Sequence, residues 1–454
     1  MGFWAVAFSA RATGESSWLL LGLTGMGAMV GVQAFWVVVG EVLGVAIAWW
    51  YMAKPFKQLS DKYDAITIPD YLVSHFKPKT NLLRIISATT LSVFVTIYVS
   101  AQIDATGAAF ESFLGWNYYI GALVGFTIVV IYIFSGGFIA VVWSDVFQGL
   151  IMLLGLVLLP IVAFATVENL GSITSALSRI DPGLVNIWGK GGFSFYNLMT
   201  IGGLFFIGLG FLGSPQVFVR FMSIKDENEI KKGRWVAIVF TIITDSAAVL
   251  IGIIGRYIFT ENGQDVEAIL GNGAQNVLPM LVDNIFAPVI IGLFIAAVLS
   301  AIMSTVDSLL VVASSAVTRD FYQKIFHPDL KEENLVRTSR LVTLGIAILA
   351  LSIAMIVSFT TPDRTIFWFV IFGWSGIAAT FCPVIILSLF YPGYTEKGAI
   401  ASMVTGFLGV PLFKFIMPLI PDIGIYFTQL AELFPSFLFA IIAGILVSKL
   451  TVRK

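Results

Sequence analysis

The sequence has very few of the residues that build disulfides, metal centres and acid–base catalytic sites. It contains one cysteine, Cys382, and two histidines, His75 and His327, among 454 residues. A single cysteine within an apolar run excludes a disulfide framework and a metal site of the Cys/His type. Both histidines are expected in polar loops, and the sequence offers no nucleophile–base pair. We therefore predict that the protein is not an enzyme.

Charged residues are also scarce. Asp, Glu, Lys and Arg make up 12% of the chain with a net charge of -1, whereas hydrophobic residues make up 58%. A net charge so close to zero argues against a nucleic-acid partner. The apolar content is far above that of a soluble domain. The composition predicts an all-α polytopic membrane protein in contact with the lipid bilayer, and it says nothing about oligomeric state.

Twelve apolar segments follow one another along the chain. They cover about 4–31, 32–53, 82–112, 118–136, 138–166, 196–222, 234–260, 286–322, 336–358, 365–391, 397–417 and 432–450. A membrane-spanning helix needs about 20 residues, so each segment is a candidate span. The connections between them are too short to fold alone. We predict about 12 transmembrane helices in a single domain, 1–454.

Basic residues are unevenly divided between the connections. The second, sixth and eighth connections carry Lys54, Lys57, Lys62, Lys77, Lys79 and Arg84, then Arg220, Lys225, Lys231, Lys232 and Arg234, and then Arg319, Lys324, Lys331, Arg337 and Arg340, whereas the opposite side has Arg179, Lys190, Arg364 and Lys414. Loops rich in Lys and Arg stay in the cytoplasm. The distribution predicts that both termini are cytoplasmic.

The segment 286–322 carries polar residues in its interior. Ala301, Ser304, Thr305 and Ser308 have the spacing of one helical stripe, and Asp307 flanks it. Oxygen ligands of this kind suit a small hard cation such as Na⁺, and an ionisable residue at membrane depth is a functional candidate. The alternative is that these hydroxyls bond to their own helix or join two helices.

Two other segments contain interruptions. The first holds a polar patch at 9–17, and the sixth holds the run GLGFLGSP at 208–215. Pro215 removes a backbone donor, and glycine lowers the cost of unwinding. Two interrupted segments five spans apart are typical of transporters built from inverted five-helix repeats, in which the half-helix ends face solute and ion. Alternatively, the glycines allow close packing between helices.

Further charges lie inside or near apolar segments, namely Arg11, Glu15, Glu41, Asp104, Asp145, Asp245 and Arg256. An isolated charge in hydrocarbon is costly, so each is expected to pair, neutralise or contact water. Arg11 and Glu15 are four residues apart and can pair if that turn is helical. For Glu41, Asp104 and Asp245 an ion pair, a protonated carboxyl and a ligand remain open.

The run LSAIMSTVDSLLVVASSAVTRDFY at 299–322 resembles the signature of the sodium:solute symporter family. Other stretches resemble its sodium/proline symporter branch: IPDY at 68–71, RIISA at 84–88, SGGF at 135–138, WSD at 143–145, GLGFLGSP at 208–215 and WSG at 374–376. The similarity extends from about residue 4 to about residue 417. It implies a leucine-transporter-like 5+5 inverted repeat, with 4–166 and 196–391 as the repeats and 397–450 as two additional helices.

The resemblance also implies a function and its residues. It implies import of a small organic solute by alternating access, driven by Na⁺, across the plasma membrane, here a bacterial inner membrane. The implied sodium site comprises the carbonyls of Ala12, Glu15 and Ala301 with Ser304 and Thr305, and a possible second sodium site comprises Asp145, Asp307 and Ser308. The predicted solute pocket comprises Gly14, Ser16, Ser17, Tyr98, Ile207, Phe211, Ser214 and Trp374.

The pocket departs from the proline branch at two places. Gly14 stands where that branch has an aspartate, and Ile207 and Phe211 replace an aromatic pair. We predict an amino acid as the solute, proline first, with a sugar, a monocarboxylate or another zwitterion as alternatives. A channel or a sensor on the same fold is the second class of function considered.

Overall fold

The computed structural model describes residues 1–135, 138–167, 170–327, 329–330 and 335–451, and every regular element in these ranges is helical. Gly136 and Gly137 of the SGGF motif lie outside the described residues, and so do the last residue of the fourth predicted segment (Gly136 again) and Lys331. Within these ranges, ten helical runs are long and apolar enough to cross a membrane: Trp18–Tyr63, Leu82–Leu114, Phe138–Ala165, Phe195–Ser223, Glu227–Phe259, Pro288–Phe326, Leu335–Thr360, Ile366–Phe390, Glu396–Leu419 and Leu433–Thr451. The all-α membrane class is confirmed. Ten runs rather than twelve result because Trp18–Tyr63 joins parts of two predicted segments and Tyr118–Tyr132 is shorter than the others.

Both predicted interruptions are present. Helix α1 (Phe3–Gly14) ends at Glu15, and helical structure resumes at the π-helical η1 (Trp18–Leu23), which continues into α2 (Thr24–Val30). In the sixth segment, α10 (Phe195–Phe205) runs into the 3-10 turn η5 (Phe206–Leu212), and α11 (Pro215–Ser223) starts at the proline. Proline is favoured at this position because its missing N–H would have no helical partner.

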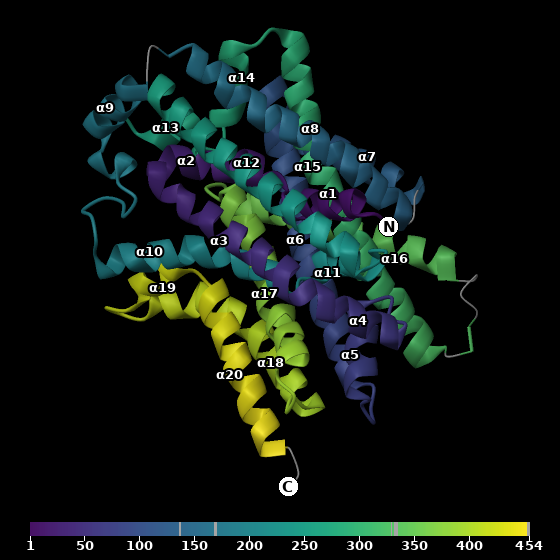
Figure 1. Cartoon of the computed structure of the whole chain (residues 1–454). Coiled ribbons are helices and arrows are strands. Elements are labelled where there is room, and N and C mark those ends of the chain that lie inside the picture. The colour runs from purple at the N-terminus through teal and green to yellow at the C-terminus, as the bar shows by residue number, and fades with distance from the viewer. Residues whose placement is uncertain (136–137, 168–169, 328, 331–334, 452–454) are drawn as a thin grey trace.

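The remaining α-helices and the π-helical η7 follow along the chain. They are α3 (Phe35–Ile47), α4 (Ala53–Tyr63), α5 (Ile68–Phe76), α6 (Leu82–Leu114), α7 (Tyr118–Ser135), α8 (Phe138–Ala165), α9 (Leu170–Ile180), α12 (Glu227–Phe259), α13 (Val266–Leu270), α14 (Val277–Ile285), α15 (Pro288–Ser315), η7 (Ala316–Phe326), α16 (Leu335–Thr360), α17 (Ile366–Phe390), α18 (Glu396–Pro411), α19 (Gly424–Leu430) and α20 (Leu433–Thr451). Helix α1 packs against α8, α11, α12 and α15. The C-terminal helices α18 and α20 pack on each other and on α17, at one side of the molecule (Figure 1).

Glycines bring some of these helices into backbone contact. A Cβ on Gly208, in the broken sixth helix, would lie 2.0 Å from the carbonyl oxygen of Gly40 on α3. A Cβ on Gly252, in α12, would lie 2.0 Å from the carbonyl oxygen of Thr24 on α2. The glycines of the sixth segment therefore serve close packing as well as the interruption.

Helix α5 places His75 in a short helix, so the prediction of a loop for this residue was wrong. Thr67 caps the helix by accepting a hydrogen bond from the Asp70 amide (3.1 Å), and Pro69 lies in the first turn. The apolar face of α5, including Ile68 and Leu72, is buried. This burial orders a segment that would otherwise be a polar connection.

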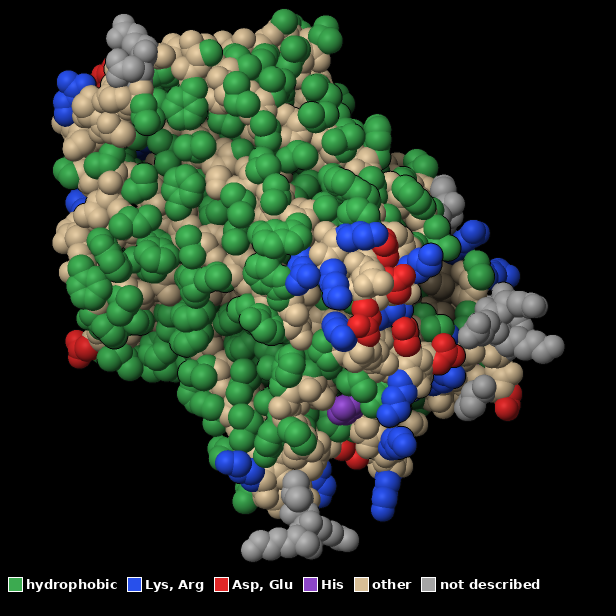
Figure 2. Space-filling view, viewed as in Figure 1, with side chains coloured by type: hydrophobic (Ala, Val, Ile, Leu, Met, Phe, Trp, Pro, Cys, Tyr) green, Lys and Arg blue, Asp and Glu red, His purple; other side chains and the backbone are tan. Residues whose placement is uncertain are grey.

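The surface divides into apolar and charged regions. Figure 2 shows hydrophobic side chains over most of the visible face, with Lys and Arg gathered around α4, α5 and α11. Two arginines assigned to basic connections are instead buried: Arg84 is 9% exposed and Arg220 is 1% exposed. Both lie inside helices, α6 and α11, where Arg84 pairs with Asp70 (2.8 Å) and with Asp320.

Candidate functional site

The polar stripe of α15 faces the broken end of α1. The Ser304 hydroxyl lies 2.9 Å from the Ala12 carbonyl oxygen and 3.1 Å from the Ala301 carbonyl oxygen, and it can donate to either. The Thr305 hydroxyl donates to the Thr13 carbonyl (3.2 Å). All of these residues are buried. The stripe thus contacts a second helix as well as its own, and four of the predicted sodium-site residues lie at one seam.

The end of α1 supplies acceptors at this seam. The helix stops at Gly14, and Glu15 is extended (φ -96°, ψ 97°), so the last carbonyls of α1 have no following turn of helix to bond with. The C-terminal end of a helix carries partial negative charge. Carbonyl and hydroxyl oxygens on this end form a donor set that fits a Na⁺ ion. The Glu15 side chain points elsewhere, because it pairs with Arg11.

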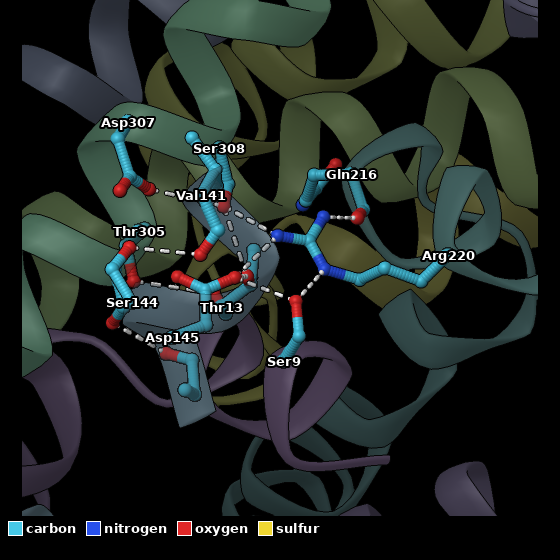
Figure 3. A network of polar contacts seen from close by, with 12 residues as sticks. Ser9, Thr13, Val141, Ser144, Asp145, Gln216, Arg220, Thr305, Asp307 and Ser308 are labelled. Atoms are coloured by element: carbon cyan, nitrogen blue, oxygen red, sulfur yellow. Dashed lines mark hydrogen bonds and ion pairs between the residues drawn. The ribbon is translucent and has the colours of Figure 1, made fainter. Parts of the chain in front are cut away.

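A second polar network lies beside this seam (Figure 3). Asp145 on α8 accepts from the Ser9 hydroxyl (2.6 Å) and from Arg220 Nη2 (2.9 Å). The same Arg220 nitrogen donates to the Ser308 hydroxyl, and Arg220 Nε donates to Ser9 (2.7 Å). Thr13 joins α1 to this network through Ser308 (3.1 Å).

The guanidinium of Arg220 therefore lies between Asp145 and Ser308, two of the three residues predicted for a second sodium. The third, Asp307, accepts from the Ser308 hydroxyl (3.2 Å). One feature of the sequence does point to Arg220: it lies in the same apolar segment as the break, five residues after Pro215. Because Arg220 also lies near the end of an apolar segment, we grouped it with the basic residues of the following connection.

The predicted pocket residues surround the two breaks. The Trp374 ring lies 5.0 Å from Phe211 and 6.4 Å from Tyr98, measured between ring centroids. Its indole N–H donates to the Ile207 carbonyl in η5 (3.0 Å). Gly14 abuts Phe211, since a Cβ on Gly14 would lie 2.7 Å from the Phe211 ring. The structure thus brings these five predicted residues together.

The other predicted pocket residues bond to the interrupted backbone. Gln102 on α6 donates to the Ser16 hydroxyl (3.1 Å) and accepts from the Ser17 amide (3.2 Å). Ser214 donates to the Gly210 carbonyl within its own break (2.6 Å). Gln102 was missed from sequence, although it follows Tyr98 by one helical turn and so shares its face. Its side-chain oxygen satisfies the Ser17 amide, which the break in the first helix exposes.

Two cavities flank this centre. One, of about 880 Å³, is lined by residues of α11, α15, η7 and α16, including Pro215, Val311 and Arg340. The other, of about 210 Å³, is lined by residues including Gly22 and Phe367. Neither is lined by Tyr98, Phe211 or Trp374, which are all buried. The predicted pocket is closed in this conformation.

Comparisons with known proteins agree with this architecture. The model of the sodium:solute symporter family matches residues 1–406. The chain is 34% identical to the high-affinity proline transporter PutP of Bacillus subtilis, over 95% of this chain and 90% of the relative. It is 34% identical to the osmoregulated proline transporter OpuE of the same organism, over 100% and 88%.

Solved structures show the same fold. A Na⁺-coupled sialic acid symporter in a substrate-bound outward-open state superposes with a TM-score of 0.79 at 18% identity, over 100% of this chain and 90% of that one. MhsT in complex with L-phenylalanine superposes with a TM-score of 0.56 at 14% identity, over 98% of both chains. The fold is leucine-transporter-like. The chain is a multi-pass membrane protein that belongs to the sodium:solute symporter family.

Proposed function

We propose that this protein is a secondary transporter that imports a small organic solute together with Na⁺ by alternating access. The observation that carries the proposal is the seam at which Ser304 of α15 bridges to the Ala12 carbonyl at the broken end of α1 (2.9 Å). Na⁺ entering here would be held by the carbonyls of Ala12, Glu15 and Ala301 and by the hydroxyls of Ser304 and Thr305. The ion is cargo as well as coupling partner.

Ion binding at this seam gives a physical basis for coupling. One ion joins α15 to the first helix at the point where that helix breaks, and the same break carries Ser16 and Ser17 of the predicted pocket. Fixing the break therefore favours the conformation that binds the solute. Because linkage is reciprocal, bound solute raises the affinity for Na⁺ by the same factor.

Proline is the first candidate for the solute, since the similar proteins PutP and OpuE are proline transporters. A closed aromatic wall of Tyr98, Phe211 and Trp374 suits a small solute with an apolar ring. A sugar, a monocarboxylate or another zwitterion is the alternative. A second sodium at Asp145, Asp307 and Ser308 stays a prediction, and it requires the Arg220 guanidinium to move away.

The topology that accompanies this function is also proposed. It has twelve spans, with 4–166 and 196–391 as inverted repeats and 397–450 as two further helices, in a bacterial plasma membrane. Cytoplasmic termini are supported by the gathered basic residues and by the position of Met1, whose nitrogen lies 2.7 Å from the Ser223 carbonyl oxygen at the end of α11.

The test is uptake of radiolabelled proline into proteoliposomes with and without an inward Na⁺ gradient. Wild type is compared with Ser304→Ala and Thr305→Ala, and Ser314→Ala is the matched control, since its hydroxyl bonds only to Val311 of its own helix. Losing one polar contact to a charged partner costs about 1.5–3 kcal/mol. We therefore expect the apparent affinity for Na⁺ in the uptake assay to fall about 10- to 150-fold in the first two variants. The control variant should keep the wild-type affinity.

A second readout separates the ion from the solute. Na⁺ should protect wild type, but not Ser304→Ala, against thermal unfolding, because a ligand that binds only the folded state stabilises it. If there is no proline uptake but Na⁺ still protects the protein, proline is excluded as the solute and Na⁺-coupled symport remains the proposed function. Absence of any Na⁺ effect on uptake or stability would refute the sodium site.

A further inference from the structure

One corner of the buried Arg11 guanidinium lacks a partner beside the predicted pocket. Arg11 lies in the last turn of α1 before the break and is 1% exposed. Its Nε (3.1 Å) and Nη2 (2.5 Å) both donate to one Glu15 oxygen, and Nη2 also donates to Glu41 of α3 (3.3 Å). Within the described residues, Nη1 has no hydrogen-bond acceptor. Two N–H groups of a buried cation are therefore left unbonded.

The two carboxylates fix the direction of these unbonded N–H groups. A guanidinium is planar and presents its donors in a rigid fork. Because Glu15 binds the edge formed by Nε and Nη2, the Nη1 corner is directed away from the Glu15 oxygen on that edge. Glu41 holds Nη2 from a second helix. Glu15 and Glu41 are thus positioning residues for Arg11.

The free nitrogen lies against two residues of the predicted pocket. A Cβ on Gly14 would lie 3.7 Å from Arg11 Nη1 and 2.7 Å from the Phe211 ring. Phe211 covers the guanidinium, whose central carbon is 4.7 Å from the ring centroid, and it also packs on Trp374. Glycine at position 14 therefore leaves Nη1 without a competing side chain, and the Phe211 ring is the group that a solute would displace.

Other buried polar atoms without a partner do not offer the same chemistry. Among the described residues, Arg256 is the other arginine with buried, unbonded nitrogens, but it lies in the last turn of α12, outside the predicted pocket. Ser17 Oγ is unbonded within the pocket and is neutral. The second oxygen of Glu15, Oε2, is also buried and unbonded. The pair Arg11–Glu15 thus presents a free donor and a free acceptor of opposite charge.

This pair selects the chemistry of the solute. Leaving a charged donor buried and unbonded is costly, and a carboxylate is a strong acceptor for a guanidinium. A solute with a carboxylate alone would add to a negative excess, because Arg11 already faces Glu15 and Glu41. An ammonium group on the same solute offsets that charge, and Glu15 Oε2 can accept its hydrogen bond. The cluster therefore fits a zwitterion better than a sugar or a monocarboxylate.

We propose that Arg11 binds the carboxylate of the solute and that the solute is a zwitterionic amino acid. Binding moves the Phe211 ring off the guanidinium and places a solute oxygen at Nη1. The inference rests on the proposed function, since it concerns the solute of that symport. It narrows the solute class, because sugars and monocarboxylates lack at least one of the two charged groups.

The first experiment identifies the solute class without transport. Thermal unfolding of the purified full-length protein in Na⁺ is measured with each common amino acid, with glucose and with lactate, because a ligand of the folded state stabilises it. We expect an amino acid to stabilise wild type, and its amide, which lacks the carboxylate, to have no effect. If only glucose or lactate stabilises, or if Na⁺ protects and no solute does, the inference is overturned and symport remains. If Na⁺ gives no protection, the proposed symport fails, and the amino-acid result still decides the role of Arg11.

The second experiment assigns the carboxylate to Arg11. Arg11→Lys keeps a cation between Glu15 and Glu41 but loses the planar fork of N–H groups, and exposed Arg337→Met on α16 is the control. Losing a charge-assisted hydrogen bond weakens binding about 10- to 150-fold. We expect that loss of amino-acid affinity in Arg11→Lys by isothermal titration calorimetry, with Na⁺ protection retained and the control unchanged. Wild-type amino-acid affinity in Arg11→Lys would overturn the inference.

A matched pair of substitutions at Gly14 tests the same nitrogen with Arg11 in place, and it decides the matter if Arg11→Lys does not fold. Gly14→Asp and Gly14→Asn add the same bulk against Phe211, but only the aspartate brings a carboxylate to Nη1. We expect amino-acid affinity to be at least about tenfold weaker in Gly14→Asp than in Gly14→Asn. Equal affinities in the two variants would show that Nη1 does not bind the carboxylate of the solute.

Discussion

The ion pair between Arg220 and Asp145 offers a quantitative test of the network in Figure 3. Both side chains are buried, and they meet at 2.9 Å. Replacing Arg220 by Met leaves Asp145 with two hydroxyl contacts, from Ser9 at 2.6 Å and Thr13 at 3.5 Å. Breaking a buried pair from one side costs about 3–5 kcal/mol, because a charge remains uncompensated. We expect that loss in the free energy of unfolding.

The double variant makes the test specific. Asp145→Asn alone leaves the Arg220 guanidinium buried without a counter-charge, so we expect a similar loss. Arg220→Met with Asp145→Asn removes both charges, and we expect it to lose about 2–3 kcal/mol less than the sum of the single variants. Unfolding is followed by tryptophan fluorescence during titration with denaturing detergent. The exposed pair Lys54–Glu227 (2.8 Å) is the control, and its removal should change stability little.

The result that would refute this reasoning is simple additivity of the two substitutions. The same variants also test the second sodium. With the guanidinium gone, Asp145, Asp307 and Ser308 present three oxygen-bearing side chains to one space. We expect Na⁺ to stabilise Arg220→Met more steeply than wild type, and Li⁺ or choline serves as the comparison cation. An identical Na⁺ response in both proteins would argue against a cation site there.

Three further substitutions test the packing around the breaks. Gly208→Ala should unfold the protein or lower its melting temperature strongly, because its Cβ would overlap the Gly40 carbonyl at 2.0 Å; thermal unfolding measures this. Gly14→Ala places a methyl group against Phe211 and should cost about 1–3 kcal/mol, and a second substitution, Phe211→Leu, should restore part of that loss in the same assay. Gln102→Leu leaves the Ser17 amide at the first break without its hydrogen-bond acceptor, which costs about 1–3 kcal/mol of stability. We expect a lower melting temperature and, with it, lower proline uptake.

Much of the fold followed from patterns that are local in the sequence. The lengths of the apolar segments predicted the membrane spans. Pro215 and the glycines that precede it predicted the break in the sixth segment. The spacing of Ser304, Thr305 and Ser308 predicted a common face, since helical periodicity fixes which side chains point the same way. The pair Arg11–Glu15 was predicted on the same ground. These features depend on neighbours within about two helical turns.

Features that depend on distant segments were not predictable in the same way. Arg220 stands at the end of an apolar segment, where a loop charge and a buried ion-pair partner look alike, and only the approach of α8 decides between them. Gln102 has no partner until the first helix breaks beside it. The ion pair between Arg11 and Glu41 (3.3 Å) forms only when α1 and α3 are brought together.

The glycine contacts described for the fold bear on how such a molecule can move. Where backbone lies directly on backbone, as at Gly208 on Gly40 and at Gly252 on Thr24, no side chain is available to change rotamer and absorb a shift. These pairs of helices must therefore travel as one rigid unit. The seam between α1 and α15 is different, because the Ser304 hydroxyl can exchange the Ala12 carbonyl for the Ala301 carbonyl and so keep a hydrogen bond while the helices shift. In the proposed mechanism, α1 and α15 therefore slide past each other at the proposed sodium site.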